Sequence, residues 1–593
     1  MTTYIAPVRD MLFAMKELAG LAEVNALPGY EESSEDLVEA ILDEAGKFAS
    51  DVLAPINAQG DRQGARWADT VVTAADGFKD AYTQFSDNGW HAMPAGTDLG
   101  GQGLPTLVSI PVQEMWKSAN MAFALCPMLT MGAVEAVAHH GSDELKARYL
   151  PNMVAGTWTG TMNLTEPQAG SDLAAVRTKA VPNGDHYLIS GTKIFITWGE
   201  HDMAENIIHL VLARLPDAPP GVKGISLFVV PKFMVNADGS LGARNDLLCA
   251  SIEHKMGIHG SPTAVMAFGE KEGAIGYLVG QANRGLEYMF TMMNHARLNV
   301  GLEGVAISER AYQQALNYAR ERVQGKPIGG TPGQPILQHP DVRRMLMNMK
   351  SRVEAMRATA YYTAAQIDVA HSHPDDATRL EAQRFVELFT PVVKGWCTEA
   401  SLEITSTGIQ VHGGVGFIEE TGACQHMRDA RITTIYEGTT GIQANDLIGR
   451  KLSRDKGETA NALASRIRAT ADQLTGSGDA ALARLGERLN AGVQVFTDTV
   501  SWVLAQTNPA VPAAGAVPFL WLTGTVVGAW QMARAAQVAS ARLAAGDGDA
   551  SFWKAKQATA SFFIEHELPR TLAWQAAIQN GAASVLALED AQF

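Results

Sequence analysis

One glutamate stands between an apolar run and a glycine in the segment 431–440. Two isoleucines and the ring of Tyr436 lie before Glu437, so we expect little water around its carboxylate. Exclusion of water raises the pKa of a carboxyl group towards neutrality, where a carboxylate is a useful general base. Gly438 follows and lets a ligand approach the backbone closely. We therefore expect Glu437 to be a catalytic base; the alternative is a buried structural glutamate at the end of a helix or strand.

A glycine-rich segment, 408–417, precedes this glutamate. Its glycines, among them Gly413 and Gly414, place bare backbone where a phosphate-bearing cofactor has room to bind. On its own such a loop is weak support for a site. The order and spacing of this segment, of residues 427–431 and of residues 436–439 together resemble the carboxy-terminal signature of the acyl-CoA dehydrogenase family.

Two upstream segments resemble the same family in the same order. Residues 162–172 contain the string T-E-P-x-A-G-S-D, in which Pro167 and Gly170 fix a turn that directs hydroxyl groups and main-chain amides to one place. Residues 253–263 resemble the family's K-M-G-x-x-x-S turn, which closes its middle domain.

A strand is expected at residues 191–197, which alternate so that Phe195 and Thr197 face the same side. In the family the end of this strand packs an aromatic ring and a hydroxyl against a flavin. One departure from the family pattern is Trp198, where many relatives have a small or an amide residue.

The resemblance implies FAD as the cofactor and an acyl-CoA as the substrate. The implied FAD contacts are Met162, Leu164, Thr165, Gly170, Ser171, Phe195, Ile196, Thr197, Arg322, Gln338, Gln410, Gly413, Gly414 and Thr439. The implied substrate contacts are Ser171, Asn294, Arg297, Tyr436 and Gly438.

Three of these positions depart from the family pattern or have an alternative interpretation. Asn294 stands where the family commonly has an acid, and Arg297 has an ordinary ion pair along its helix as the alternative. Arg322 resembles the arginine that reaches the pyrophosphate of the flavin dinucleotide across a dimer interface. The phenylalanine that usually precedes the following glycine is missing here.

Most of the other polar residues that could do chemistry are expected to have structural or surface roles. Among the rival carboxylates, Glu166 suits a turn, Glu419 and Glu420 suit solvent, and Glu403 is a further candidate base. His339, His412 and His426 lack metal-ligand spacing, so no metal site is expected. The four cysteines contain no CxxC motif and are expected to be free thiols.

The chemistry implied by the resemblance is α,β-dehydrogenation of a thioester to a trans-2-enoyl-CoA. Glu437 would take the α-proton, its backbone N–H and a flavin ribityl hydroxyl would hold the carbonyl oxygen, and flavin N5 would accept the β-hydrogen as hydride. The electrons would pass to an electron-transfer flavoprotein. The alternatives are an acyl-CoA oxidase that reduces O2 and a non-catalytic nucleic-acid-binding flavoprotein. The substrate stays open between 3-methylmercaptopropionyl-CoA and a fatty acyl-CoA.

The elements that position these residues change character along the chain, and they predict an α+β fold similar to that of the family. We expect an N-terminal extension at 1–32 and a helical domain at 33–156, which Ser33 and Ser34 are placed to cap. A β-barrel or sandwich domain is expected at 157–280, with strands at 187–197, 207–213, 224–230 and 263–268. A four-helix-bundle domain at 281–453 and an extra helical domain at 454–593 would follow.

The extra domain resembles that of a large subfamily of the same enzymes. Smaller relatives join pairs of dimers through exposed helices, and an extension has the size to cover that surface. We therefore expect a homodimer; the alternative is a loosely attached domain that serves an unrelated partner.

Composition fits a large enzyme of several domains. The chain has 593 residues, 46% of them hydrophobic, and 47 basic against 63 acidic residues give a net charge of −16. Such a surface repels nucleic acid and anionic membranes. The N-terminus lacks the pattern of a signal or transit peptide, and we expect no apolar stretch approaching the ~20 residues that cross a bilayer. The expected compartment is the cytoplasm.

Overall fold

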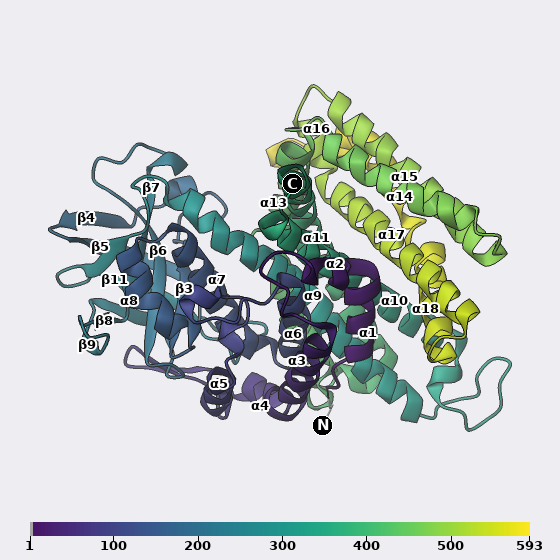
Figure 1. Cartoon of the computed structure of the whole chain (residues 1–593), viewed down its shortest axis with the longest axis horizontal. Coiled ribbons are helices and arrows are strands. Elements are labelled where there is room, and N and C mark those ends of the chain that lie inside the picture. The colour runs from purple at the N-terminus through teal and green to yellow at the C-terminus, as the bar shows by residue number, and fades with distance from the viewer. Residues whose placement is uncertain (1–3) are drawn as a thin grey trace.

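The computed structural model describes residues 4–593 and has a β-rich region on one side, long helices in the centre and a further layer of helices on the other side (Figure 1). The N-terminal helices lie beneath and in front of the centre. The predicted α+β fold is confirmed by this arrangement of helical and β regions.

The N-terminal region is helical, as expected. Its longer elements are α3 (Glu35–Phe48), α4 (Ala54–Gln63), α5 (Phe78–Asp87), α6 (Thr106–Ala119), α7 (Met121–His140) and α8 (Asp143–Val154). Ser34 is the N-cap of α3, where its hydroxyl accepts a hydrogen bond from Leu37 N at 3.3 Å. Ser33 is buried and does not cap this helix.

A short hairpin interrupts this helical region and was not predicted. Strands β1 (Arg66–Ala68) and β2 (Val71–Thr73) are joined by Asp69 and Thr70, which both have positive φ. Two consecutive left-handed residues make the tight turn that twisted hairpins prefer. Because this pair is not Asn-Gly and each strand has three residues, the local pattern is too weak to predict it.

The middle region is built around one antiparallel-rich sheet. Its strands are β3 (Trp158–Asn163), β4 (Lys179–Asn183), β5 (His186–Thr197), β6 (Asn206–Arg214), β7 (Ile225–Pro231), β10 (Leu247–Ile252), β11 (Thr263–Phe268) and β12 (Ala274–Leu278). They run in the order β10-β11-β5-β12-β7-β6-β3, with β4 beside β5 and β6. The four predicted strands are thus confirmed as β5, β6, β7 and β11, within a residue at each end.

Three long helices form the centre: α9 (Gly285–Glu321), α10 (Pro340–Ser372) and α11 (Asp376–His412). Helices α9 and α11 approach closely, because a Cβ on Gly301 or Gly304 would lie 2.7 Å or less from backbone atoms of Val393 or Cys397. Gly408 of α11 lies beside Ala311 of α9, so the two helices run in the same direction. Their carboxyl ends therefore lie at the same end of the molecule.

Shorter elements continue the chain from α11 to the extra domain. They are η8 (Gly413–Phe417), η9 (Glu419–Thr421), α12 (Ala423–Ala430), η10 (Arg431–Thr434), α13 (Thr440–Asp446) and η11 (Leu447–Leu452). Helix α13 packs against α11. The turn between η10 and α13 contains Glu437.

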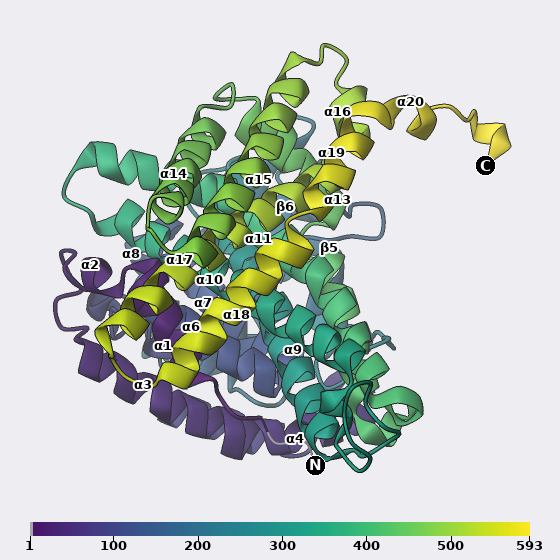
Figure 2. The same cartoon turned by 90° about the vertical axis from the view of Figure 1, so that its right-hand side faces the viewer.

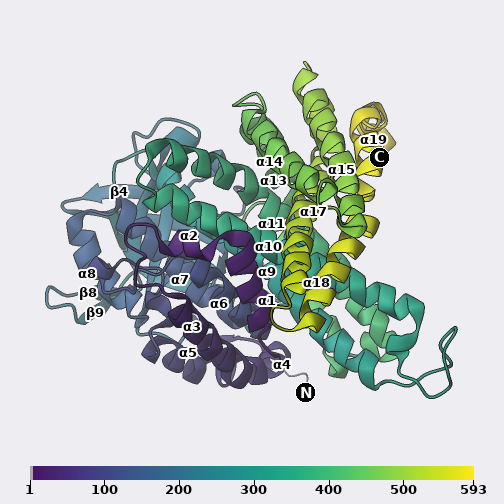
Figure 3. The ribbon, with the colours of Figure 1, turned by 45° about the vertical axis from the view of Figure 1, so that its right-hand side comes forward.

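The extra domain contains α14 (Glu458–Thr475), α15 (Ala480–Ala505), α16 (Ala510–Ala514), α17 (Ala516–Ala545), α18 (Ala550–Phe562), α19 (Arg570–Asn580) and α20 (Ala582–Val585). Helix α17 packs against α10, α11 and α13. Figure 3 shows these green and yellow helices along one side of the bundle, away from the sheet, and Figure 2 shows α20 leading to a C-terminus that projects from the body.

The N-terminal extension contributes to the same side. It folds into α1 (Val8–Phe13), η1 (Ala14–Ala19) and α2 (Leu21–Asn25), and η1 packs on α10 and α17. Arg534 of α17 donates to Leu18 O at 2.7 Å. The first and last parts of the chain therefore hold each other against the bundle.

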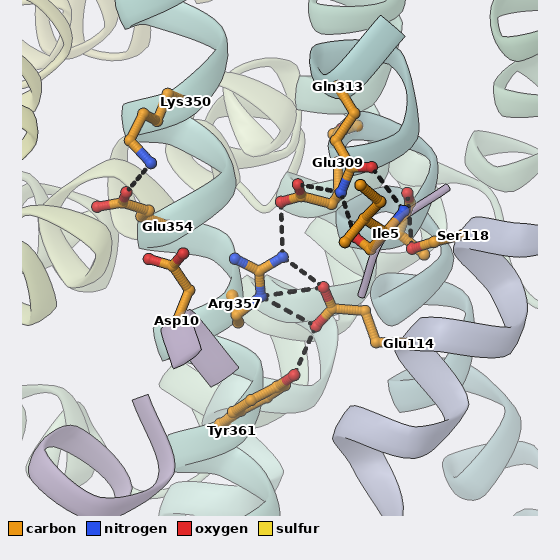
Figure 4. A network of polar contacts seen from close by, with 12 residues as sticks. Ile5, Asp10, Glu114, Ser118, Glu309, Gln313, Lys350, Glu354, Arg357 and Tyr361 are labelled. Carbon is orange, nitrogen blue, oxygen red and sulfur yellow. Dashed lines mark hydrogen bonds and ion pairs between the residues drawn. The ribbon is translucent and has the colours of Figure 1, made fainter. Parts of the chain in front are cut away.

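Buried charges join these layers (Figure 4). Arg357 of α10 donates from two nitrogens to Glu114 of α6, at 2.6 and 3.0 Å, and to Glu309 of α9 at 2.8 Å. Two bonds from one guanidinium fix both distance and orientation. On the preceding turns of α10, Lys350 pairs with Glu354 at 2.8 Å. One arginine thus ties three helices of the core.

Helix α7 is the element that meets the length and composition of a membrane span within residues 4–593. It has 20 residues, so the expectation that no apolar stretch approaches this length was wrong. Its window is 89% buried inside the protein, against β3 and α9 among others. A buried core helix explains its composition.

Candidate active site

Glu437 lies at a backbone position that is unusual for a side-chain-bearing residue. Its φ is +55°, and Gly438 follows with φ +90°. Left-handed conformations at non-glycine residues cost free energy and persist only where the surroundings enforce them. A Cβ on Gly438 would lie 2.5 Å from Gln443 Nε2, so glycine is required there.

Contacts from two helices hold this turn. Lys394 of α11 donates from Nζ to Gly438 O at 2.6 Å, and Gln443 of α13 donates to Glu437 O at 3.3 Å. Thr439 is the N-cap of α13 and accepts from Ile442 N at 3.3 Å. Both carbonyls of the left-handed pair are therefore bonded from outside the turn.

The protein around Glu437 sets its charge. The side chain is partly exposed, and burial raises the pKa of its carboxyl group to about 7, against the opposing effect of Arg297 and Lys394. Burial also lowers the pKa of Lys394 to about 8. At neutral pH this carboxylate can both take and release a proton, as the sequence predicts for a base.

Arg297 interacts electrostatically with the carboxylates of Asp446 and Glu437, and neither of them lies on its own helix. Its side chain is buried, and within residues 4–593 its Nε has no hydrogen-bond partner. Along α9 its guanidinium contacts the amide Oδ1 of Asn294 at 3.5 Å, which is no ion pair. Arg297 and Asn294 are thus neighbours, and the arginine keeps donor capacity for a ligand.

The rival carboxylates are held as structural anions or exposed to solvent. Glu166 pairs with buried Lys193 at 2.8 Å, and this pair together with backbone and hydroxyl donors lowers its pKa to about 2. Glu403 pairs with Arg352 at 2.7 Å and with Arg570 at 3.1 Å, which also lowers its pKa to about 2. Glu419 and Glu420 are exposed. The low pKa values of Glu166 and Glu403 make these two carboxylates poor bases near pH 7.

The residues that resemble the flavin-side signatures meet at one end of the sheet. Ile194 N donates to Thr165 O at 2.9 Å, which joins β5 to the segment after β3. Thr197 of β5 pairs with Thr263 of β11. Met162 and Leu164 are buried there, whereas Gly170 and Ser171 are exposed.

Two aromatic residues at the end of β5 point in different directions. Phe195 has φ +59° and its side chain is 58% exposed. Trp198 is buried, and its Nε1 donates to Ala122 O of α7 at 3.1 Å, so this departure from the family pattern anchors the strand. Ile196 is buried within the sheet core, so its side chain cannot contact a cofactor and only its backbone is available.

The K-M-G turn contacts the helix that precedes Glu437. Ile258 N donates to Asp429 Oδ1 of α12 at 2.6 Å, and Arg428 pairs with Asp61 at 2.6 Å. A Cβ on Gly257 would lie 2.5 Å from the backbone of Arg428. The middle and carboxy-terminal signatures, far apart in sequence, are therefore joined.

A second group of sequence-predicted residues lies elsewhere. Arg322, Gln338, Gln410, Gly413 and Gly414 are exposed and lie near the carboxyl ends of α9 and α11. Position 322 follows Arg297 by 25 residues, which is about 37 Å at 1.5 Å per helical residue. The structure thus separates the predicted cofactor contacts into two groups.

Sequence reasoning missed three charged residues around the turn: Lys394, which donates to Gly438 O, Glu303, which accepts from Tyr436, and Lys117, which acts on Glu303. Each is buried on a long helix, α11, α9 or α6. The sequence signal that could have found them is a charged residue on the apolar face of a helix. Charged residues are rarely fully buried unless they are paired, so such a residue indicates a buried partner.

The predicted structural histidines and cysteines have no ligand-binding geometry. His426 contacts Gln314 Oε1 at 2.8 Å, and His412 contacts Gly408 O at 2.7 Å and stacks on Tyr318. The described part of the chain contains no cluster of three potential metal ligands. Cys126, Cys249, Cys397 and Cys424 are free thiols.

Known domains match almost the whole chain in order. Acyl-CoA dehydrogenase sequence families match at residues 35–157 for the N-terminal domain, 161–270 for the middle domain and 283–452 for the C-terminal domain. A family described as acetyl-CoA dehydrogenase C-terminal like matches residues 463–589.

Characterised relatives extend over the full length. The chain is 50% identical to the 3-methylmercaptopropionyl-CoA dehydrogenase of Ruegeria pomeroyi, over 98% of this chain and 99% of that protein. It is 36% identical to a butyryl-CoA dehydrogenase of Syntrophomonas wolfei, over 100% and 99%. Its fold is similar to that of Caenorhabditis elegans ACDH-11 in complex with C11-CoA, with a TM-score of 0.75, 19% identity and coverage of 98% and 96%.

Proposed function

This chain belongs to the acyl-CoA dehydrogenase family of oxidoreductases, and on that premise we propose that it converts a short acyl-CoA thioester into the trans-2-enoyl-CoA, with FAD as its cofactor and Glu437 as its base. The observation that carries this proposal is the geometry of Glu437. A partly enclosed carboxyl group with a pKa of about 7 lies on a turn that two helices hold in a left-handed conformation.

The reacting thioester needs a base and a group that stabilises negative charge on its carbonyl oxygen. Glu437 takes the proton from the α-carbon. Within residues 4–593 the Glu437 N–H donates to no other group, so it is available to donate to the thioester oxygen. Arg297 and Lys394 place positive charge beside the base and keep part of it ionised at neutral pH.

The residues around the end of the sheet fit a flavin dinucleotide. A Cβ on Gly170 would have no atom within 4 Å, so bare backbone is open to a phosphate-bearing group there, and the same holds for Gly413 and Gly414 of the second group, at the end of α11. Phe195, exposed at the end of β5, offers an aromatic face for a planar ring. When bound, FAD supplies the acceptor for the β-hydrogen, which leaves as hydride.

We propose that the remaining FAD contacts are made by three sets of residues: Met162, Leu164, Thr165, Ser171, the backbone of Ile196 and Thr197 near the sheet, Thr439 at the start of α13, and Arg322, Gln338 and Gln410 at the far end of the bundle. Arg322 of the second group lies about 37 Å along α9 from Arg297, by helical rise. We propose that the two groups hold one flavin by coming from two copies of the chain.

Exposed apolar side chains support such a homodimer. Large hydrophobic residues gather in the segments beside Arg322 and Gly413: Val323, Ile328, Val415, Phe417 and Ile418. Clusters of exposed apolar residues mark interaction surfaces. The extra domain covers part of the bundle, because α17 packs on α10, α11 and α13. Light scattering should give a dimer, and a stable tetramer would contradict the proposal that the extra domain covers the surface through which smaller relatives join pairs of dimers.

The substrate proposal comes from the relatives. One acts on 3-methylmercaptopropionyl-CoA and another on butyryl-CoA, by their names. Both are short linear acyl groups, and the higher identity favours the methylthio compound. We place Ser171, Asn294, Arg297, Tyr436 and Gly438 at the thioester.

We propose an electron-transfer flavoprotein as the electron acceptor and the cytoplasm as the compartment. The test is a series of acyl-CoA thioesters of graded length, with 3-methylmercaptopropionyl-CoA included, assayed with a dye acceptor, with electron-transfer flavoprotein and with oxygen. The proposal expects the highest kcat/KM for the short substrates and little peroxide. A stoichiometric yield of peroxide would instead identify an oxidase.

A further inference from the structure

Tyr436, the residue before the base, is bonded to a second carboxylate. Its hydroxyl donates to Glu303 Oε2, which lies in the middle of α9. Glu303 is 0% exposed, and its other oxygen, Oε1, has no hydrogen-bond partner in the described part of the chain. A buried carboxylate with one unpartnered oxygen costs free energy, so its presence calls for a physical reason.

Titratable groups from three other elements act on Glu303. They are Lys117 of α6, Lys394 of α11, and Tyr436 and Glu437 of the turn. Lys117 donates to Asn299 Oδ1 at 2.8 Å and to Gln113 Oε1 at 3.4 Å, so it lies near the carboxylate without a direct bond to it. Arg297 and Lys394 also act on Glu437.

Neither lysine fully compensates this carboxylate. Burial raises the pKa of Glu303 to about 7, although Lys117, Tyr436 and Lys394 oppose that rise. Glu437 acts in the same direction as burial, because two negative charges repel.

A purely structural role explains the position poorly. A neutral glutamine would accept the same hydrogen bond from Tyr436 without the free-energy cost of burying a charge. The glutamate adds a charge that the hydrogen bond does not require. That charge lies behind the turn that carries the base.

We propose that Glu303 is a positioning residue for Glu437: it fixes the Tyr436 ring through its hydroxyl and, by its own negative charge, opposes ionisation of the base. This inference rests on the proposed role of Glu437 and deepens it. Uptake of the α-proton neutralises Glu437 and relieves the repulsion, so the charge of Glu303 makes Glu437 a stronger base during proton transfer.

The first test measures the pH dependence of flavin reduction by an acyl-CoA in anaerobic stopped flow. Glu303→Gln keeps an acceptor for Tyr436 and removes the charge, so the acid limb of the rate should shift about one pH unit lower. Tyr436→Phe removes the donor that stabilises the Glu303 anion, so Glu303 stays protonated over a wider range and the limb should shift in the same direction.

The double variant shows whether Glu303 and Tyr436 shift the acid limb through one shared interaction or independently. If both residues act through one coupling, Glu303→Gln with Tyr436→Phe shifts the limb no further than Glu303→Gln alone. A merely structural role lowers the rate at every pH and leaves the limb in place. An unmoved limb in Glu303→Gln, or additive shifts, would overturn the proposal.

A second measurement needs no turnover. The carboxyl infrared bands of the resting protein are titrated, and subtraction of a Glu437→Gln spectrum isolates the band of Glu437. The band should titrate at lower pH in Glu303→Gln than in the wild type. Asp368→Asn is the matched control, because Asp368 is another buried carboxyl with a pKa raised to about 7 by burial, but it bonds to Thr106 N and Leu107 N at the start of α6.

The two measurements separate the proposals. If no acyl-CoA reduces the flavin of the wild type, the proposed function fails, whereas the infrared titration still reports the coupling between Glu303 and Glu437. If Glu437 titrates at the same pH in both proteins, the coupling is absent and this inference is wrong.

Discussion

Glu437 combines a left-handed backbone with a partly enclosed carboxyl group whose pKa is raised by burial. Lys394 and Gln443 hold the carbonyls of the turn, and the resulting position places the carboxyl group beside Arg297. Strained, partly desolvated residues cluster at functional sites because stability is lost there for reactivity.

The titration of Glu437 predicts how the reaction depends on pH. A base must be ionised before it accepts the α-proton, and the pKa of this carboxyl is raised to about 7. The rate of flavin reduction at limiting substrate should therefore fall about tenfold per pH unit below that value and level off above it. Stopped-flow rates between pH 5.5 and 9 check this. A rate independent of pH in that interval would exclude Glu437 as the titrating base.

The same carboxyl should destabilise the folded protein at high pH. Because its pKa is raised on folding, its contribution to stability is complete below the unfolded value of about 4.5 and is lost as pH rises to about 7. Glu437→Gln removes this loss. The melting temperature of the variant should match that of the wild type near pH 5 and exceed it at pH 8. Equal melting temperatures at both pH values would show that burial of this charge carries no cost.

At the scale of secondary-structure elements, the close contact between α9 and α11 depends on small residues such as Gly304. A Cβ on Gly304 would lie 2.5 Å from Cys397 O, one turn from Lys394. Gly304→Ala should therefore push the helices apart, lower the free energy of unfolding by about 1–3 kcal/mol and lower kcat through the displaced lysine.

Calorimetry and steady-state kinetics measure both effects. Gly449→Ala is the control, because a Cβ there meets no atom within 4 Å and an alanine in a helical position loses less conformational entropy on folding. If Gly304→Ala kept the stability and activity of this control, the helix contact would not set the position of the turn.

Local patterns predicted the elements better than the contacts between them. Strand β11 has the predicted bounds, because its β-branched and aromatic alternation is complete within the segment. The three- and four-residue spacing of Leu37, Ile41, Ala45, Phe48 and Val52 predicts one apolar face that begins on α3. This prediction was wrong in part, because Leu37 is exposed, while Val38 and Leu42 are buried. Both faces carry apolar residues, so tertiary packing decides which one turns inward.

The candidate site was predictable in part for the same reason. Glu437, Arg297 and the K-M-G turn follow from short segments with a family resemblance. Lys394 contacts Gly438 across 44 residues of sequence, and Glu303 contacts Tyr436 across 133. No local pattern reveals such pairs, because the parallel arrangement of α9 and α11 creates them.

At the scale of the whole molecule, the extra domain is joined to the bundle and to the N-terminal extension by charge as well as by packing. Lys556 of α18 is 4% exposed at its side chain and pairs with Asp10 and, at 3.3 Å, with Glu354. Lys556→Met would leave Asp10 and Glu354 with less compensation. Removal of one partner of a buried pair costs about 3–5 kcal/mol.

The expected result for Lys556→Met is a melting temperature lower by several degrees and faster protease cleavage in the linker 453–457. Arg9→Met is the matched control, since Arg9 pairs with Asp549 between the same two regions but both side chains are about half exposed. An exposed pair contributes about 0–1 kcal/mol. Equal effects of the two variants would show that the buried pair does not hold the domain.

The most direct test of the account is anaerobic mixing of 3-methylmercaptopropionyl-CoA or butyryl-CoA with FAD-loaded wild type and Glu437→Gln, followed at the flavin absorbance. Loss of a general base is expected to slow bleaching by about 10²–10⁴-fold, while the variant still binds FAD and the thioester. Bleaching of Glu437→Gln at the wild-type rate would contradict the central claim, because another group would then remove the α-proton.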